Sequence, residues 1–247
     1  FSEIYKKTKE DYYIKIAEKQ KKCIEEKFWP ENFENERLFI LSTIVWTESS
    51  YYSALKEKPE KNLINLADYV LQRESSEQEF YSYAQEMIRK VLALSNYYEL
   101  TGKEEFYKKS KQIMIDSEKK RLENNELIEY VKAEFLRAWC EIYKTKKERE
   151  VLDYINKNFE IVLSFRNNDR SFGTNEIEKT LVSYQVLGAL DACYEATNDN
   201  KYSQLIVESL PFLLNNSDVK QGGIIELENK KSISLNAKIL KVLAKLK

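Results

Sequence analysis

The scarcity of chain-breaking residues constrains this sequence more than any other feature. Its 247 residues include only 5 Gly and 3 Pro, too few for the many tight turns that an all-β fold requires. Apolar residues instead recur at helical spacing almost throughout, and short polar segments interrupt them. The pattern predicts an all-α protein and excludes an all-β fold.

A repeat of two helices runs through this pattern. One long apolar segment ends in YELTG at 98–102, and another ends in YEATN at 194–198. A third ends in YKTK at 143–146, and the Tyr pair at 51–52 matches the pair at 97–98. A more charged segment follows each of these ends. The repeating unit is therefore a hairpin with an apolar A helix followed by a charged B helix.

The A helices are expected to lie inside and the B helices outside. The A helices are predicted at 36–56, 77–100, 126–144, 176–196 and 232–246. The charged opening helix from Ser2 to Lys27 has no A helix before it, and the last A helix has no B helix after it. Pairing the N-terminal helix with the C-terminal helix gives an α/α toroid of about five helical hairpins. We expect one domain over residues 1–247, with an open superhelix as the alternative.

Alignment of the A helices by their closing turns predicts a partly polar seam. Spacings of four and three positions put the members from each helix on one face. The larger polar members are Arg89, Arg137 and Gln185, and the first helix contributes Thr43, Thr47 and Ser50. A guanidinium in an apolar core is costly unless it is paired or solvated. The large polar residues are therefore expected to meet carboxylates or to line a solvated pocket, whereas the small members fit close helix packing.

The charge balance limits the partners. The 40 basic and 41 acidic residues give a net charge of -1, which provides no footprint for a nucleic-acid backbone. No apolar run reaches the roughly 20 residues that span a bilayer. The chain begins with Phe rather than Met, so the compartment stays open: a cytoplasmic location is slightly favoured, and export or anchoring after loss of a leader is the alternative.

The composition of potential ligands and nucleophiles excludes several kinds of site. The chain has no His, which removes imidazole as a general base, a proton shuttle and a metal ligand. Cys23, Cys140 and Cys193 lie far apart without the spacing of a zinc or redox motif. We expect three buried thiols, no metal site and no cofactor.

Two short resemblances to known families accompany the repeat. The segment LSNYYELTG at 94–102, followed by an amphipathic helix, resembles the hairpin unit of the (α/α) barrels of six-hairpin glycosidases and sugar epimerases. The segment DRSFG at 169–173, which leads into a helix around 180–194, is similar to the loop and helix repeat of terpenoid cyclase and prenyltransferase toroids. The segment QGGI at 221–224 resembles the same loop. The resemblances imply a toroid.

Departures from these families narrow the chemistry that the resemblances imply. The chain lacks the Asp-x-Asp-Asp and Asp-Asp-x-x-Asp motifs of terpenoid cyclases. It also lacks the His of prenyltransferase zinc sites and of sugar epimerases. Cleavage of a glycosidic bond needs only two carboxyl groups, one protonated and one charged. Carboxylate chemistry on a carbohydrate therefore remains.

The catalytic candidates come from the two longest connections, 166–175 and 215–231, because long loops between such helices carry function. Asp169 and Glu226 are the predicted catalytic pair, with Glu134 in reserve. Each has a simpler interpretation: Asp169 as the holder of a turn, and Glu226 as a solvated loop residue.

Substrate binding is assigned to polar and aromatic residues near these loops and along the seam. Aromatic side chains at helical spacing are more often core than ligand platforms. The predicted substrate-binding residues are Arg170, Phe172, Arg89, Arg137, Gln185, Tyr184 and Trp46.

Three functions stay open at this point. The first is a toroid that processes or binds a carbohydrate, as a hydrolase or lyase with a carboxylate pair, and its ligand is a small molecule or oligosaccharide. The second is a non-catalytic helical-repeat scaffold that binds a protein or peptide. The third is a toroid that holds a lipid or isoprenoid. A toroid alone does not choose among them.

Overall fold

The computed structural model describes residues 2–27, 29, 33–77, 79–123, 128–174, 179–215, 217–218, 223–226 and 230–231. Within these residues the protein is all-α apart from three short strands. The chain divides into two compact units, Phe1–Asn125 and Glu126–Lys247. The all-α fold class is confirmed, and the single domain stays a prediction.

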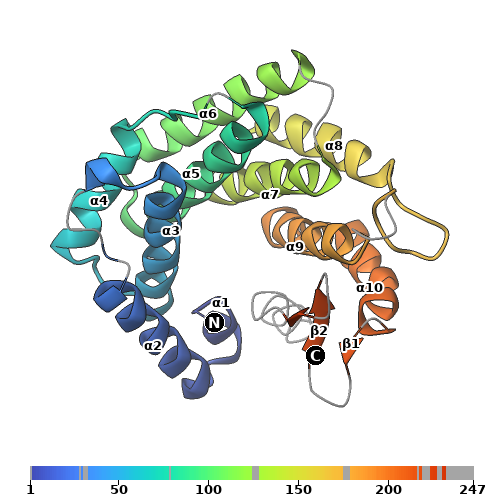
Figure 1. Cartoon of the computed structure of the whole chain (residues 1–247), viewed down its shortest axis with the longest axis horizontal. Coiled ribbons are helices and arrows are strands. Elements are labelled where there is room, and N and C mark those ends of the chain that lie inside the picture. Colours follow the sequence, from blue (N-terminus) through green and yellow to red (C-terminus); the bar gives the residue numbers. More distant parts are fainter. Residues whose placement is uncertain are drawn as a thin grey trace. The chain divides into compact units, whose positions relative to one another are not determined.

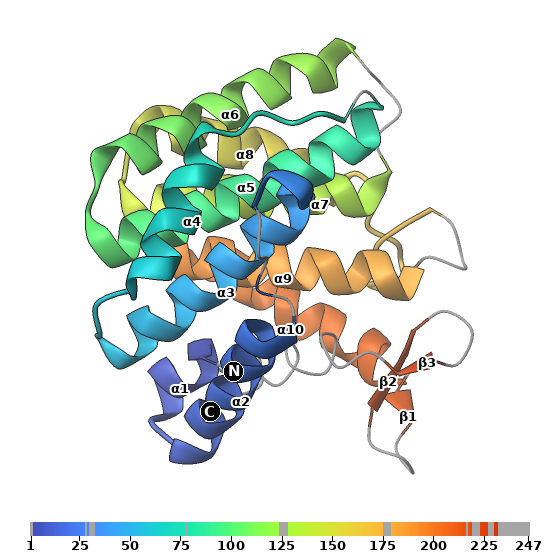
Figure 2. The ribbon, with the colours of Figure 1, turned by 60° about the vertical axis from the view of Figure 1, so that its left-hand side comes forward.

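Unit 1 is built from hairpins of helices. Within it, α3 packs along α5, α4 packs against α3, and α6 packs against α5 (Figures 1 and 2). The pair α1 and α2 packs on α3. The elements are α1 (Ser2–Thr8), α2 (Asp11–Lys27), the 3-10 helix η1 (Phe33–Asn35), α3 (Leu38–Leu55), α4 (Lys61–Gln72), α5 (Phe80–Thr101) and α6 (Glu104–Glu123).

Unit 2 repeats the hairpin arrangement. Here α7 packs along α9, α8 packs against α7, and α10 packs against α9. The helices are α7 (Glu129–Thr145), α8 (Arg149–Leu163), α9 (Lys179–Thr197) and α10 (Asn200–Asn215). The strands β1 (Ser217–Asp218), β2 (Gly223–Glu226) and β3 (Lys230–Lys231) form an antiparallel sheet in the order β1-β2-β3. The predicted 215–231 loop thus contains a small sheet.

Four of the predicted A helices occur as α3, α5, α7 and α9, and the fifth, 232–246, lies outside the described residues. The repeated turn has the same geometry in both units. Gly102 and Asn198 both have positive φ, and their N–H groups donate to the carbonyls of Tyr98 and Tyr194 at 2.7 and 2.8 Å. This left-handed residue ends each helix. The sequence repeat therefore corresponds to a structural repeat.

The opening segment is a correction to the prediction. One helix was expected over 2–27, but Lys9 adopts φ 58 and separates α1 from α2. Its N–H donates to the Tyr5 carbonyl, and the Glu10 N–H donates to the Thr8 hydroxyl. These bonds satisfy backbone groups at the break, and α2 begins as a separate helix at Asp11.

A buried charged pair on α5 ties three helices of unit 1 together. Glu86 accepts a 3.2 Å hydrogen bond from the Phe39 N–H at the start of α3, and it also accepts from Ser75. One turn later, Lys90 donates to the Arg73 carbonyl at the end of α4. A carboxylate at a helix N-terminus and an ammonium at a C-terminus both complement the helix dipole. Glu86 therefore caps the start of α3, and Lys90 caps the end of α4.

Unit 2 contains a disulfide, which corrects the expectation of three thiols. Cys140 on α7 and Cys193 on α9 are bonded, with their Cα atoms 5.0 Å apart, and both are buried. Cys23 on α2 is free and half-buried. Spacing along the chain gave no sign of the bond because it joins two helices that are neighbours only in the fold.

None of the helices in the described part of the chain combines the length and apolar character that crossing a bilayer requires.

Candidate functional site

A group of charged residues gathers in unit 1 where α2 meets α3 and the start of α4. The packing that brings them together is apolar: Ile14 and Ala17 of α2 bury against Ala54 of α3. Lys21 follows Ala17 by one helical turn, so it extends from the same face of α2. Its ammonium group reaches the rings of Tyr51 and Tyr52, 5.9 and 5.5 Å from their centres.

The turn between α3 and α4 places Glu60 opposite Lys21. Lys56 ends α3 in the left-handed conformation, and the Glu57 N–H donates back to the Tyr52 carbonyl at 3.0 Å. The chain then returns so that Glu60 becomes the N-cap of α4. The Tyr52 hydroxyl donates a 2.7 Å hydrogen bond to Oε1 of Glu60. This bond fixes the Glu60 carboxylate beside α3.

Lys21 lies among three carboxylates from three segments. Its Nζ atom is 4.0 Å from Oε2 of Glu48 on α3 and 3.5 Å from Oε1 of Glu60. It also makes a close ion pair with Glu25, one turn along α2. Since the Glu48 and Glu60 oxygens both lie within 4.0 Å of one atom, they are at most about 8 Å apart.

Glu48 is the most unusual member of the group. It is the one charged residue of α3, and its side chain is only 3% exposed. Its second oxygen, Oε1, is buried without a hydrogen-bond partner among the described residues. Burial raises the pKa of the Glu48 carboxyl to about 7, although the positive charge of Lys21 acts in the opposite direction. Near neutral pH, Glu48 therefore exchanges a proton readily.

Glu60 has the opposite tendency. The hydrogen bond from Tyr52 and the charge of Lys21 lower the pKa of the Glu60 carboxyl. Its side chain is 62% exposed, so water also supports its charged form. Burial and the bond to Glu60 raise the pKa of the Tyr52 hydroxyl, which remains a donor. One carboxyl of the group is thus readily protonated while its neighbour stays charged.

A cavity of about 180 Å³ opens between these residues. Its wall combines carboxylates with aromatic, amide and aliphatic groups, and consists of Glu25, Trp29, Glu48, Tyr52, Glu60, Asn62 and Leu63. This volume is below the roughly 300–1,000 Å³ of pockets for drug-sized ligands. The cavity therefore suits a small chemical group rather than a drug-sized ligand. We call it the Glu48 pocket.

The donor set of the pocket does not fit a metal ion. Among the described residues, no cluster of three or more Cys, Asp or Glu side chains has a metal-binding arrangement. The ammonium of Lys21 occupies the position between the carboxylates instead. The chemistry that this arrangement supports is proton transfer by two carboxyl groups with separated pKa values.

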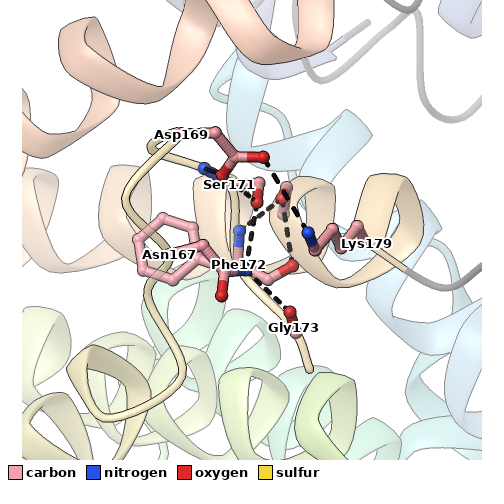
Figure 3. A network of polar contacts seen from close by, with 7 residues as sticks. Asn167, Asp169, Ser171, Phe172, Gly173 and Lys179 are labelled. Carbon is pink, nitrogen blue, oxygen red and sulfur yellow. Dashed lines mark hydrogen bonds and ion pairs between the residues drawn. The ribbon is translucent and has the colours of Figure 1, made fainter. Parts of the chain in front are cut away.

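The predicted catalytic residue Asp169 holds a turn in unit 2. Its Oδ1 accepts hydrogen bonds from the N–H and the hydroxyl of Ser171, as Figure 3 shows. Asn167 braces the same turn by donating to Ser171 and to the Gly173 carbonyl. Lys179 lies 3.9 Å from the other oxygen of Asp169. The bonds from Ser171 lower the pKa of the Asp169 carboxyl and keep it charged.

The other residues predicted to bind substrate near Asp169 differ in their exposure. Arg170 is exposed and has φ 69, a conformation that belongs to the tight turn. Phe172 is fully buried, and its N–H donates to the Ser183 hydroxyl of α9 at 2.7 Å. Tyr184 on α9 is only 1% exposed. In this conformation Phe172 and Tyr184 are core residues, and neither ring offers a face to a ligand.

Glu134 and Arg137, both on α7, are brought together. Their side chains are 13% exposed, and Oε1 of Glu134 lies 3.9 Å from the Arg137 guanidinium. Of the two environments expected for Arg137, a carboxylate partner or a solvated pocket, this ion pair supplies the first; a role in substrate binding stays a prediction. Gln185 on α9 is half-buried. Glu226 ends β2, and its side chain lies outside the described part of the structure, so no pairing with Asp169 can be assigned.

Arg89 and Trp46 are also brought together, in unit 1. The Arg89 guanidinium lies 4.8 Å from the centre of the Trp46 ring and 5.2 Å from that of Phe39. These aromatic faces stabilise the cation. The nearby hydroxyls of Thr43 and Thr47 donate to carbonyls one turn earlier on α3. This part of the predicted seam is therefore satisfied by its own helices.

The sequence prediction missed Glu48, Glu60 and Lys21. A signal for Glu48 was present, because α3 carries no other charge among its 18 residues. A lone carboxylate in an apolar helix must be paired, protonated or functional. The sequence around Lys21 gave no comparable signal, because Lys21 belongs to a charge-rich helix whose pattern is typical of a solvent-exposed surface.

Comparisons with known proteins leave the family open. No protein-family model matches this chain. No curated protein matches it either. The described helices are compatible with a helical-repeat fold.

Proposed function

We propose that this chain is a carbohydrate-active protein that cleaves a glycosidic bond in the Glu48 pocket. Glu48 acts as the general acid and Glu60 as the charged carboxylate. The observation that carries the proposal is that two carboxyls in opposite environments line one cavity: the Glu48 side chain is 3% exposed and that of Glu60 is 62% exposed. These environments raise the pKa of Glu48 to about 7 and accompany a lowered pKa of Glu60. Glycoside hydrolysis requires such a pair.

The reaction balances with water alone. Glu48 donates its proton to the leaving oxygen as the bond from that oxygen to the anomeric carbon breaks. Water supplies the hydroxyl that the anomeric carbon gains, and its remaining proton restores Glu48 or is taken up by Glu60. The limit of about 8 Å between the carboxylate oxygens is compatible with attack by Glu60 itself or by a water molecule that Glu60 activates.

The rest of the pocket supports sugar binding. Trp29 and Tyr52 line the cavity with aromatic groups on which a sugar ring can stack, and Asn62 adds an amide that can donate and accept. By contrast, the described residues that line a second groove, of about 250 Å³, are all uncharged: Ile24, Phe39, Ile40, Thr43 and Ile44. It offers no acid or base for hydrolysis.

The experiment is a hydrolysis assay on a panel of α- and β-nitrophenyl glycosides and oligosaccharides. We expect wild-type protein to release product from at least one, and Glu48→Gln and Glu60→Gln to lower kcat/KM about 100- to 10,000-fold. Glu57→Gln is the matched control, because Glu57 is an exposed acid in the same turn as Glu60. It does not line the Glu48 pocket, and its activity should match wild type.

Two further variants test the residues predicted from the sequence. Asp169→Asn and Glu134→Gln should retain activity if the Glu48 pocket is the active site. Loss of activity in these variants, with Glu48→Gln active, would move catalysis to unit 2 and overturn the assignment. Binding of a sugar without turnover of any substrate would contradict the hydrolase and favour a carbohydrate-binding role.

We also propose that the hairpins of the two units belong to one α/α toroid closed by the terminal helices. Support comes from the order of A and B helices and from the repeated turns at 98–102 and 194–198. Cross-linking of lysines followed by mass spectrometry tests the closure. Links between the segments 2–27 and 232–247 are expected; links confined to sequential hairpins would contradict it.

A further inference from the structure

The Glu48 pocket contains more acidic groups than its proposed reaction uses. Glu48 and Glu60 take the two roles of glycoside cleavage. Glu25, on α2, is a third carboxylate in the wall of the same cavity. It makes an ion pair with Lys21, and its side chain is 39% exposed, so a ligand can reach it.

Counted over the described residues alone, the charged groups of the pocket do not balance. Lys21 is the basic group that faces the carboxylates, and it is shared among Glu25, Glu48 and Glu60. When Glu48 is in its acid form, the carboxylates of Glu25 and Glu60 face one ammonium. One negative charge is then left over, and ionisation of Glu48 adds a second.

The pocket also has an unfilled hydrogen-bonding position that points to a ligand. Among the residues that the structure describes, Oε1 of Glu48 has no hydrogen-bond partner, although the side chain is almost completely buried. A buried polar atom without a partner is costly, and Glu48, the residue that carries this atom, lines the cavity. A bound molecule with a hydrogen-bond donor would satisfy it.

The pocket already shows how it holds an ammonium group. The Lys21 ammonium lies near two aromatic rings and several carboxylates. Trp29 supplies a further ring in the cavity wall, and a cation over an indole face is the strongest of such contacts. A second ammonium, delivered by a ligand, would meet the same kinds of group.

Resting on the proposed function, we infer that the sugar unit bound in the Glu48 pocket is an amino sugar with a free, protonated amine, and that Glu25 is the residue that selects it. The ligand amine neutralises the excess negative charge, and a hydroxyl of the sugar ring donates a hydrogen bond to Oε1 of Glu48. An acidic sugar would add to the negative charge and is disfavoured.

The test is a binding measurement on the full chain by calorimetry at pH 6 and low salt. The probes are D-glucosamine, its neutral analogue N-acetyl-D-glucosamine, D-glucose, D-glucuronate and the simple diamine putrescine. We expect glucosamine to bind about tenfold more tightly than either neutral sugar, the gain of a half-buried ion pair. Added salt should reduce the difference. Glu25→Gln should bring the ratio close to one, and Glu57→Gln should keep it.

Several results would overturn the inference. The first is equal affinity for glucosamine and glucose, and the second is a preference for glucosamine that persists in Glu25→Gln. The third is binding of putrescine as tightly as glucosamine, which would show that the pocket recognises the amine and not the sugar. Failure of the hydrolase proposal looks different. Selective binding of glucosamine without cleavage of any amino glycoside supports the inference and contradicts hydrolysis, whereas cleavage of neutral glycosides without an amine preference does the reverse.

Discussion

Oε2 of Glu48 lies 4.0 Å from Nζ of Lys21, and this contact joins the largely apolar helix α3 to the charge-rich helix α2. At such a distance the ammonium attracts the carboxylate but leaves its desolvation only partly compensated. The pKa of Glu48 therefore stays raised, at about 7, despite the nearby positive charge. The proposed acid role depends on this incomplete compensation.

Replacing Glu48 should stabilise the protein at alkaline pH. The folded-state pKa of Glu48, about 7, exceeds the ordinary value of 4.5. Between pH 4.5 and pH 7, the folded protein therefore keeps a proton on Glu48 that the unfolded chain has lost. Stability from this group is present below pH 4.5 and is lost as pH rises through 7. We expect Glu48→Gln to unfold with a free energy higher than wild type by about 2 kcal/mol at pH 8 and similar to it at pH 4. Urea unfolding at the two pH values measures this, and a constant difference would contradict it.

The same pKa values set the pH dependence of activity. Glu48 must be protonated, so kcat/KM should fall as pH rises above about 7. Glu60 must be charged, so the acid limb should lie below the ordinary value of 4.5. The groups that face Glu48 are Lys21 and Glu25 from α2, Glu60 from the turn, and Tyr52 from its own helix. A profile that rises through pH 7 would contradict the assigned roles.

Tyr52→Phe should shift the pKa of Glu60 and have only a small effect on the stability of the fold. The variant loses the 2.7 Å hydrogen bond to Oε1 of Glu60. The pKa of Glu60 then rises toward its ordinary value, and the acid limb of kcat/KM moves to higher pH. The loss of stability should be about 1 kcal/mol. An unchanged acid limb, measured beside wild type, would show that the hydroxyl does not hold the carboxylate.

The disulfide should be the main covalent restraint of unit 2. It joins residues 53 positions apart, and closure of such a loop stabilises a folded domain by about 2–4 kcal/mol. We expect Cys140→Ser with Cys193→Ser to lower the free energy of unfolding by that amount, and Cys23→Ser to change it little. Thiol titration of unfolded protein should count one thiol before reduction and three after it. Three thiols before reduction would refute the bond.

The helical repeat could be predicted because its signals are local. The turns at 98–102 and 194–198 end their helices through one left-handed residue, Gly102 or Asn198. Residues that tolerate this conformation are few, so the turn is visible in the sequence. The break at Lys9 uses the same conformation in a residue that does not signal it.

The disulfide and the Glu48 pocket could not be predicted in this way, because both depend on contacts between distant segments. Cys140 and Cys193 face each other only once α7 packs along α9. Lys21 reaches Glu48 only because Ile14 and Ala17 dock α2 on α3. The catalytic residues were predicted in the two long loops instead. The described part of one of these loops forms a turn around Asp169 that is held by its own hydrogen bonds.

Asp169 should matter for the turn rather than for chemistry. Its Oδ1 accepts two hydrogen bonds from Ser171, and asparagine retains an oxygen that can accept them. Asp169→Ala should therefore lose about 1 kcal/mol of stability, whereas Asp169→Asn should stay close to wild type. Thermal unfolding of the two variants checks this, and equal stability of both would show that the turn does not need the acceptor.

The central claim is that Glu48 and Glu60 titrate far apart within one pocket, and NMR titration of the side-chain carboxyl carbons tests it most directly. With Glu48→Gln and Glu60→Gln used to assign the signals, the account predicts a pKa near 7 for Glu48 and one below 4.5 for Glu60. Titration of both carboxyls together near 4.5 would contradict it and leave the pocket without its proposed acid.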